Sequence, residues 1–127
     1  MARLPQISNA EWKVMQVLWA RHPATANEVV EVLVPETGWN HRTIRTLLNR
    51  LVKKGALSFE KDGKEYLYSP AVREETCVRA ESRSFLDRVF GGALKPALAA
   101  LLDGEDLSKD EIDELRRLLE EKEGKRS

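Results

Sequence analysis

The side chains with the most specific chemistry lie close together, between positions 42 and 53. If residues 40–54 form a helix at about 100° per residue, one face carries an apolar stripe centred near Leu51. The opposite face carries only basic, hydroxyl and amide groups, with Arg45 at the border: Arg42, Thr43, Arg45, Thr46, Asn49, Arg50 and Lys53. These groups hydrogen-bond base edges and pair with phosphates. Because a solvated face normally mixes charges and this one has no acid, the pattern favours nucleic-acid binding over a merely solubilising basic surface.

Position along this helix divides the polar set by role. In a helix-turn-helix, the N-terminal part of the second helix meets the bases. The predicted base contacts are therefore Arg42, Arg45, Thr46 and, as a further candidate, Thr43. Asn49 has an amide that suits adenine. Arg50 and Lys53 lie further along the helix, where we predict contacts with phosphates.

Two further helices are predicted before the polar one. Ser8 with Glu11, and Thr25 with Glu28, have the spacing of capping boxes. Each pair is followed by apolar residues at helical spacing. We expect the first helix to end at residues 21–23, and we expect the second to end before Pro35 and Gly38.

A β-hairpin is predicted after the polar helix. Asn40 is a favourable N-cap for that helix, and Gly55 is its expected stop. Two alternating apolar and aromatic runs within 57–69 then flank Lys61-Asp62-Gly63-Lys64, a strong hairpin signal. Lys61 and Lys64 at its tip could reach a DNA backbone or minor groove, although turn solubility explains either lysine nearly as well. Three helices and a hairpin predict a winged helix-turn-helix over residues 1–70.

Residues 71–127 are predicted to be entirely helical. Ser69-Pro70 suits a helix start, a long helix is expected over about 72–90, and Gly91-Gly92 breaks it. A short helix and a last helix capped by Ser108 follow. Their narrow apolar stripes are too small for an independent core, so we predict homodimerisation; the alternative is that they fold back on the first domain. The predicted dimerisation residues are Val78, Phe85, Leu86, Val89, Phe90, Leu94, Leu98, Leu101, Leu102, Ile112, Leu115, Leu118 and Leu119.

The zero net charge conceals an uneven distribution. Residues 1–70 hold ten basic and seven acidic groups, whereas residues 71–127 hold eleven basic and fourteen acidic groups. Within 39–64 there are seven basic groups and two acidic ones. The total therefore excludes only a uniformly basic protein, and the positive excess lies where nucleic-acid contacts are predicted.

Other functional classes find little support in the sequence. No apolar run approaches the roughly 18 residues of a membrane helix, and the first residues lack a signal-peptide core. With one cysteine and no such signals, we expect a cytoplasmic protein without a membrane partner. We expect no metal and no cofactor, because histidine and cysteine are few and scattered. Enzymatic activity is not expected, since phosphate-loop and nucleophile motifs are missing.

Four segments resemble the penicillinase repressor family (BlaI/MecI type): ISNAEWKVMQVLW, PATANEVV, TIRTLLNRLVKKGAL and ESRSFLDRVFGG. The resemblance covers roughly residues 6–122, with the segments in the same order. It implies a dimeric winged-helix repressor that binds palindromic operators of β-lactamase or penicillin-binding-protein genes. It also implies DNA contacts at Arg42, Arg45, Thr46, Arg50 and Lys53, and dimerisation beyond about residue 71.

Two positions depart from the family pattern. Some members carry Ser-Pro at the start of the polar helix, where this chain has Asn40-His41, so base preference could differ. The family is also induced by proteolysis in the dimerisation region, at an Asn-Phe bond in staphylococcal members, which implies a sensor-linked protease as a partner. The matching stretch here is Ala99-Ala100-Leu101-Leu102, so cleavage occurs at another bond nearby or induction differs.

The alternative functions are a winged-helix module that binds another protein, or a repressor of unrelated genes with a different inducer.

Overall fold

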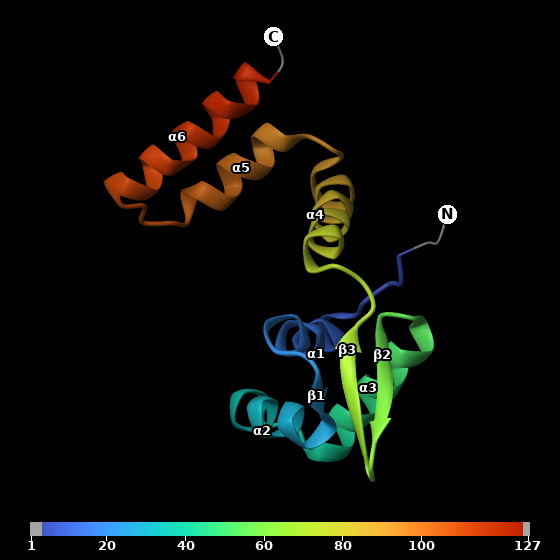
Figure 1. Cartoon of the computed structure of the whole chain (residues 1–127). Coiled ribbons are helices and arrows are strands. Elements are labelled where there is room, and N and C mark those ends of the chain that lie inside the picture. The colour runs from blue at the N-terminus through green and yellow to red at the C-terminus, as the bar shows by residue number, and fades with distance from the viewer. Residues whose placement is uncertain (1–3, 126–127) are drawn as a thin grey trace. The chain divides into compact units, whose positions relative to one another are not determined.

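The structure, a computed structural model, describes residues 4–125. The elements in this range follow the order α1 Asn9–Ala20, β1 Ala24–Thr25, α2 Ala26–Thr37, α3 His41–Lys54, β2 Leu57–Asp62, β3 Glu65–Pro70, α4 Glu74–Phe90, α5 Leu94–Asp103 and α6 Lys109–Gly124 (Figure 1). The chain divides into two compact units, one ending at Ser82 and the other beginning at Arg83. The mostly helical fold with an N-terminal winged helix is thus confirmed.

The predicted capping boxes start their helices. The Ser8 hydroxyl accepts a hydrogen bond from the Glu11 backbone N–H at 3.2 Å, and the Glu11 carboxylate accepts one from the Ser8 N–H at 2.9 Å. The same reciprocal pattern opens α2 at Thr25 and α6 at Ser108. The expected end of α2 is wrong, because α2 continues through Pro35 to Thr37 and ends at Gly38 in the left-handed conformation.

The wing belongs to a three-stranded antiparallel sheet in the order β1-β3-β2. The sequence predicted only the hairpin, because β1 is two residues long and lies between two helices. The hairpin turn is also tighter than expected: Asp62 pairs with Glu65, which leaves Gly63 and Lys64 as the loop. Gly63 has φ +65°, as the first position of a two-residue turn of this kind requires.

The predicted helix start at Ser69-Pro70 is wrong. Both residues end β3, where Ser69 pairs with Ser58 and Pro70 pairs with Leu57. Pro70 lies beyond the two β3 residues that pair with β1, so its missing N–H interrupts no ladder on that side. Helix α4 begins only at Glu74.

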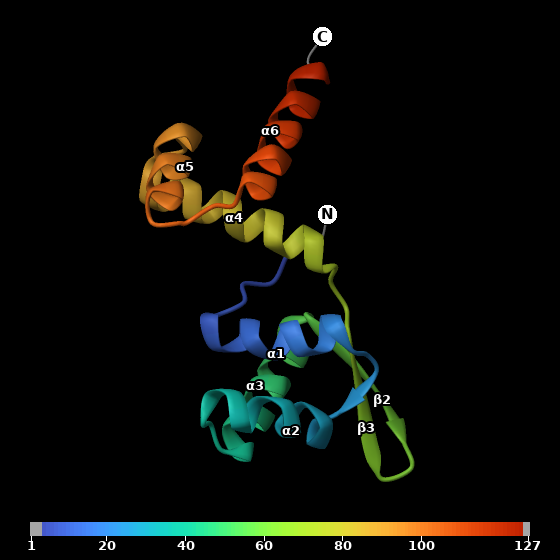
Figure 2. The same cartoon turned by 90° about the vertical axis from the view of Figure 1, so that its left-hand side faces the viewer.

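The core of the first unit lies between α1, α2, α3 and the sheet. Figure 2 shows the three helices on the same side of the hairpin. The largest fully buried apolar side chains come from all three helices: Val14, Met15, Leu18, Val29, Leu33, Ile44, Leu48 and Leu51. The segment after β3 is held to this core, because the Trp19 indole N–H donates to the Val72 carbonyl at 3.0 Å. The structural unit therefore continues past residue 70.

The second unit contains the end of α4 together with α5 and α6. Gly91 and Gly92, both with positive φ, separate α4 from α5, as predicted. Its helices bury little: Ala97 is buried, whereas the large apolar side chains of α5 and α6 are exposed. These helices therefore leave much apolar surface open to a partner.

Candidate nucleic-acid interface

Helix α3 presents its polar residues to solvent and its apolar residues to the core. Ile44, Leu47, Leu48 and Leu51 are buried. All members of the predicted polar set are exposed: Arg42, Thr43, Arg45, Thr46, Asn49, Arg50 and Lys53. The amide oxygen of Asn40 accepts from the Thr43 N–H at 2.9 Å, and Gly55 ends the helix in the left-handed conformation. Both predicted ends of α3 are confirmed, and the polar face is fully accessible.

Two polar residues of α3 make contacts that the sequence did not indicate. The guanidinium Nη2 of Arg45 donates to the side-chain oxygen of Asn27, in the first turn of α2. The Thr46 hydroxyl donates to the Arg42 carbonyl at 2.9 Å, within α3. The hydroxyl donor of Thr46 is thus occupied by its own helix. Its methyl group suits an apolar contact with thymine.

The last lysine of α3 points away from the polar face. Lys54 Nζ lies 2.5 Å from Oε1 of Glu11 and 2.8 Å from the Gln6 carbonyl oxygen. The Glu11 side chain is 1% exposed, whereas that of Lys54 is 37% exposed. Burial alone would raise the pKa of the Glu11 carboxyl, but hydrogen bonds from Lys54 and Ser8 outweigh it and lower that pKa. This contact joins the end of α3 to the start of α1.

The hairpin separates its charges between its two faces. Phe59 pairs with Tyr68, and Lys61 pairs with Tyr66. Since successive strand residues point to opposite faces, these residues share the face of buried Leu57. The acidic residues Glu60, Asp62 and Glu65 fall on the opposite face. Lys61 is therefore a strand residue on the aromatic face, while Lys64 lies in the turn.

Two hollows lie between α3 and the wing, the hairpin of β2 and β3. One, of about 310 Å³, is lined by Asn49, Val52, Lys53, Phe59, Tyr66 and Tyr68. Phe59 and Tyr66 are about half exposed and meet edge to face, with ring centroids 5.1 Å apart. Neither aromatic residue was among the predicted site residues, although both lie in the alternating runs that follow the basic helix in the sequence. The second hollow brings together Arg45, Asn27 and Lys64, and Glu65 also lines it.

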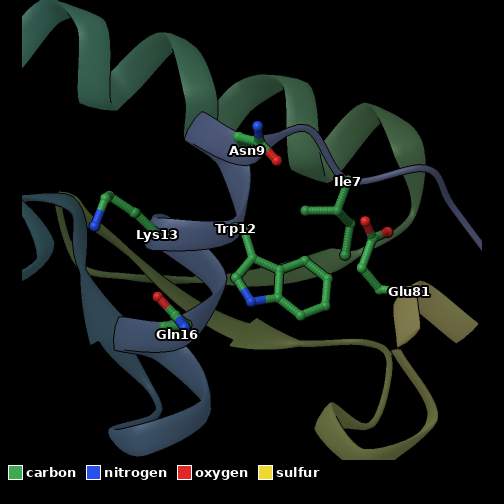
Figure 3. A pocket seen from close by; sticks show the side chains of 6 residues that line it. All are labelled: Ile7, Asn9, Trp12, Lys13, Gln16 and Glu81. Atoms are coloured by element: carbon green, nitrogen blue, oxygen red, sulfur yellow. The ribbon is translucent and has the colours of Figure 1, made fainter. Parts of the chain in front are cut away.

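A third hollow lies on α1 and is chemically different. Figure 3 shows the Trp12 indole among Ile7, Asn9, Lys13, Gln16 and Glu81, which line a volume of about 260 Å³. The charges of Lys13 and Glu81 cancel here. On the polar face of α3, by contrast, every charged group is basic. The wall of this hollow gives no reason to extend the interface to α1.

The predicted dimerisation residues are mostly exposed. Leu86 and Phe90 are partly buried. The others are between 37% and 62% exposed: Val78, Phe85, Val89, Leu94, Leu98, Leu101, Leu102, Ile112, Leu115, Leu118 and Leu119. The stretch Ala99-Ala100-Leu101-Leu102 lies inside α5 and is exposed. Cys77 is buried on α4, and burial raises the pKa of its thiol.

Two other kinds of site are absent from residues 4–125. In that range, no group of three or more histidine, cysteine or acidic side chains is arranged to hold a metal ion. Nor does this part of the chain contain a helix long and apolar enough to span a bilayer.

A helix-turn-helix followed by a β-hairpin, with a basic and accessible second helix, defines a winged-helix DNA-binding protein. The family profile described as penicillinase repressor matches residues 7–121. The chain belongs to this family.

Relatives and solved structures agree with that assignment. The penicillinase repressor of Bacillus licheniformis is 40% identical over 121 residues, which cover 95% of this chain and 94% of the relative. The methicillin resistance regulatory protein MecI of Staphylococcus aureus is 38% identical over 117 residues, with 92% and 95% covered. The solution structure of monomeric B. licheniformis BlaI with the blaP half-operator is 43% identical, with a TM-score of 0.52, and covers 59% of this chain and 92% of that one.

Proposed function

We propose that this protein is a transcriptional repressor that binds a palindromic operator as a homodimer and reads bases through α3. The observation that carries the proposal is the accessible face of α3, which has arginine, threonine, asparagine and lysine side chains and no carboxylate. Such a face attracts phosphates and offers donors to base edges at the same time. The complex of BlaI with a half-operator supports duplex DNA as the ligand.

Each part of the interface has its own role in this proposal. The first half of α3 lies in the major groove, where Arg42, Arg45 and Thr46 meet base edges, with Thr43 beside them. Asn49 is placed for adenine, and Arg50 and Lys53 bind phosphates. Lys61 and Lys64 on the wing approach the neighbouring backbone. Support comes from the surface that α3 and the wing share, where Arg45, Lys53 and Lys64 line the two hollows.

The second unit supplies the dimer contact. Its helices leave many large apolar side chains exposed, among them Leu94, Leu101, Leu118 and Leu119. Apolar side chains exposed in this number are stabilised by burial against a partner. A second copy of the chain would present the same surface. Two DNA-binding units linked in this way match a two-fold symmetric operator.

The names of the relatives suggest which genes are controlled. They refer to penicillinase and methicillin resistance, so we propose β-lactamase or penicillin-binding-protein genes as targets. Cleavage by a sensor-linked protease near Ala99-Ala100-Leu101-Leu102 would separate α6 from the rest of the chain. Without the link between the two DNA-binding units, affinity for the whole operator falls by about 10²- to 10⁴-fold. The operator would then be released while α3 is unchanged.

Selection of bound sequences from a random duplex pool tests the DNA-binding proposal. We expect an inverted repeat, bound by the full chain with a steep loss of affinity as salt rises. The control is a scrambled duplex of equal length. Equal binding to the selected and scrambled duplexes would contradict operator recognition, and a selected site without two-fold symmetry would contradict the dimeric mode.

A further inference from the structure

The proposed base-reading residue Arg45 is bonded to a residue of another helix. Its Nη2 donates to Oδ1 of Asn27, which lies in the first turn of α2, eighteen residues earlier in the chain. Both side chains are exposed. The start of α2 is itself fixed by the reciprocal bonds between Thr25 and Glu28, at 2.9 and 3.2 Å. Asn27, which accepts the hydrogen bond from Arg45, therefore lies in a helix turn whose position is fixed by capping.

One acceptor on the guanidinium leaves most of its donors available. Arginine has five N–H donors in a planar fork, and a bidentate contact with guanine uses two of them. The bond to Asn27 can therefore persist while Arg45 binds a base. An arginine that is already oriented loses less side-chain freedom on binding than one that is free to rotate.

The chemistry of the acceptor also matters. Asn27, Arg45, Lys64 and Glu65 line one open hollow of about 330 Å³. The Glu65 carboxylate would neutralise the guanidinium if it were the partner of Arg45. Among the described residues, the ion pairs do not include Arg45. A neutral amide orients the guanidinium and leaves its charge for DNA.

We infer that Asn27 is a positioning residue that directs Arg45 to one base pair of the operator and so sets specificity at that base pair. This inference rests on the proposed function. A purely structural role is a poor account of the contact, because a hydrogen bond between exposed side chains adds little to folding stability. Asn27 thus contributes to recognition through Arg45, and α2 takes part in base discrimination through this contact.

A double-mutant cycle measures this coupling. Full-length wild type, N27A, R45A and the double variant are titrated with the selected operator and with operators substituted at each base pair. R45A should lose roughly 5- to 160-fold discrimination at one base pair. N27A should lose about 2- to 12-fold at that same base pair, and it should lose nothing more when R45A is already present. Independent losses, or a loss at another base pair, would overturn the inference.

Two further variants separate orientation from charge and from folding. N27D keeps an acceptor oxygen and adds a negative charge, so it should retain discrimination while binding every duplex more weakly. N9A, which changes an exposed asparagine in the first turn of α1, should behave as wild type. In the free protein, N27A should speed exchange of the Arg45 side-chain N–H groups with water, and unchanged exchange would refute the contact. If wild type itself does not discriminate the operator from substituted duplexes, the proposed function is wrong. If wild type discriminates and N27A discriminates equally well, only the role of Asn27 is wrong.

Discussion

The ammonium of Lys54 lies 2.5 Å from Oε1 of Glu11, so the last turn of α3 is tied to the first turn of α1. The carboxylate is almost completely buried, and its Oε2 has no hydrogen-bond partner among residues 4–125. A buried charge with one cationic partner depends strongly on that partner. The contact therefore joins the end of α3 to α1, in addition to the apolar packing of α3 in the core.

Replacing Lys54 with alanine should destabilise the fold. The substitution leaves a buried carboxylate without its cation, and we expect the free energy of unfolding to fall by about 2–3 kcal/mol. Chemical denaturation of the full chain measures the change. K53A is the matched control, because Lys53 is exposed on the adjacent position of the same helix. Equal stability of K54A and K53A would contradict a role for the Glu11 contact.

The same contact predicts a pH dependence of stability. The pKa of Glu11 is lowered in the folded chain, from a usual value of 4.5, because bonds from Lys54 and Ser8 outweigh burial. A lowered pKa gives a stabilising contribution that is complete above the unfolded pKa and is lost as pH falls through the folded one. Unfolding measured from pH 7 down to pH 3 should therefore show a steeper loss for wild type than for E11Q. Parallel curves would show that Glu11 does not contribute.

Arg45 should determine specificity more than general affinity. Removing its guanidinium in R45A should weaken binding to the selected operator by roughly 1–3 kcal/mol and relax discrimination at one base pair. Binding to scrambled duplex should change much less. A gel-shift series with operators altered at single positions gives the comparison. Retention of the wild-type sequence preference would show that Arg45 does not read a base.

Lys53 should behave in the opposite way. A phosphate contact is independent of sequence, so K53A should weaken operator and scrambled duplex to a similar extent. It should also reduce the slope of log affinity against log salt by about one. Titrations at several salt concentrations provide the slopes. K13A is the control, because Lys13 is an exposed lysine on α1, outside the proposed interface; an unchanged slope for K53A would remove Lys53 from the phosphate contacts.

Local signals in the sequence predicted most elements, whereas contacts between distant residues required the structure. Capping at Ser8, Thr25 and Asn40 depends on neighbours three residues away, so these helix starts could be predicted. Pro70 also suits a helix start locally, but pairing with Leu57 makes it a strand residue. The bond between Asn27 and Arg45 has no sequence pattern, because it depends on how α2 and α3 cross.

The exposed apolar surface of the second unit predicts how the chain assembles. A chain shortened to residues 1–82, the first compact unit, should be monomeric in sedimentation and should bind the full operator about 10²- to 10⁴-fold more weakly than the full chain. Its affinity for a single half-site should match that of the full chain, because α3 is intact. The full-length variant L118E provides a second test without shortening, since Leu118 is 62% exposed and a charge there should weaken only a contact with a partner. Dimers of the shortened chain would place the interface in the first unit instead.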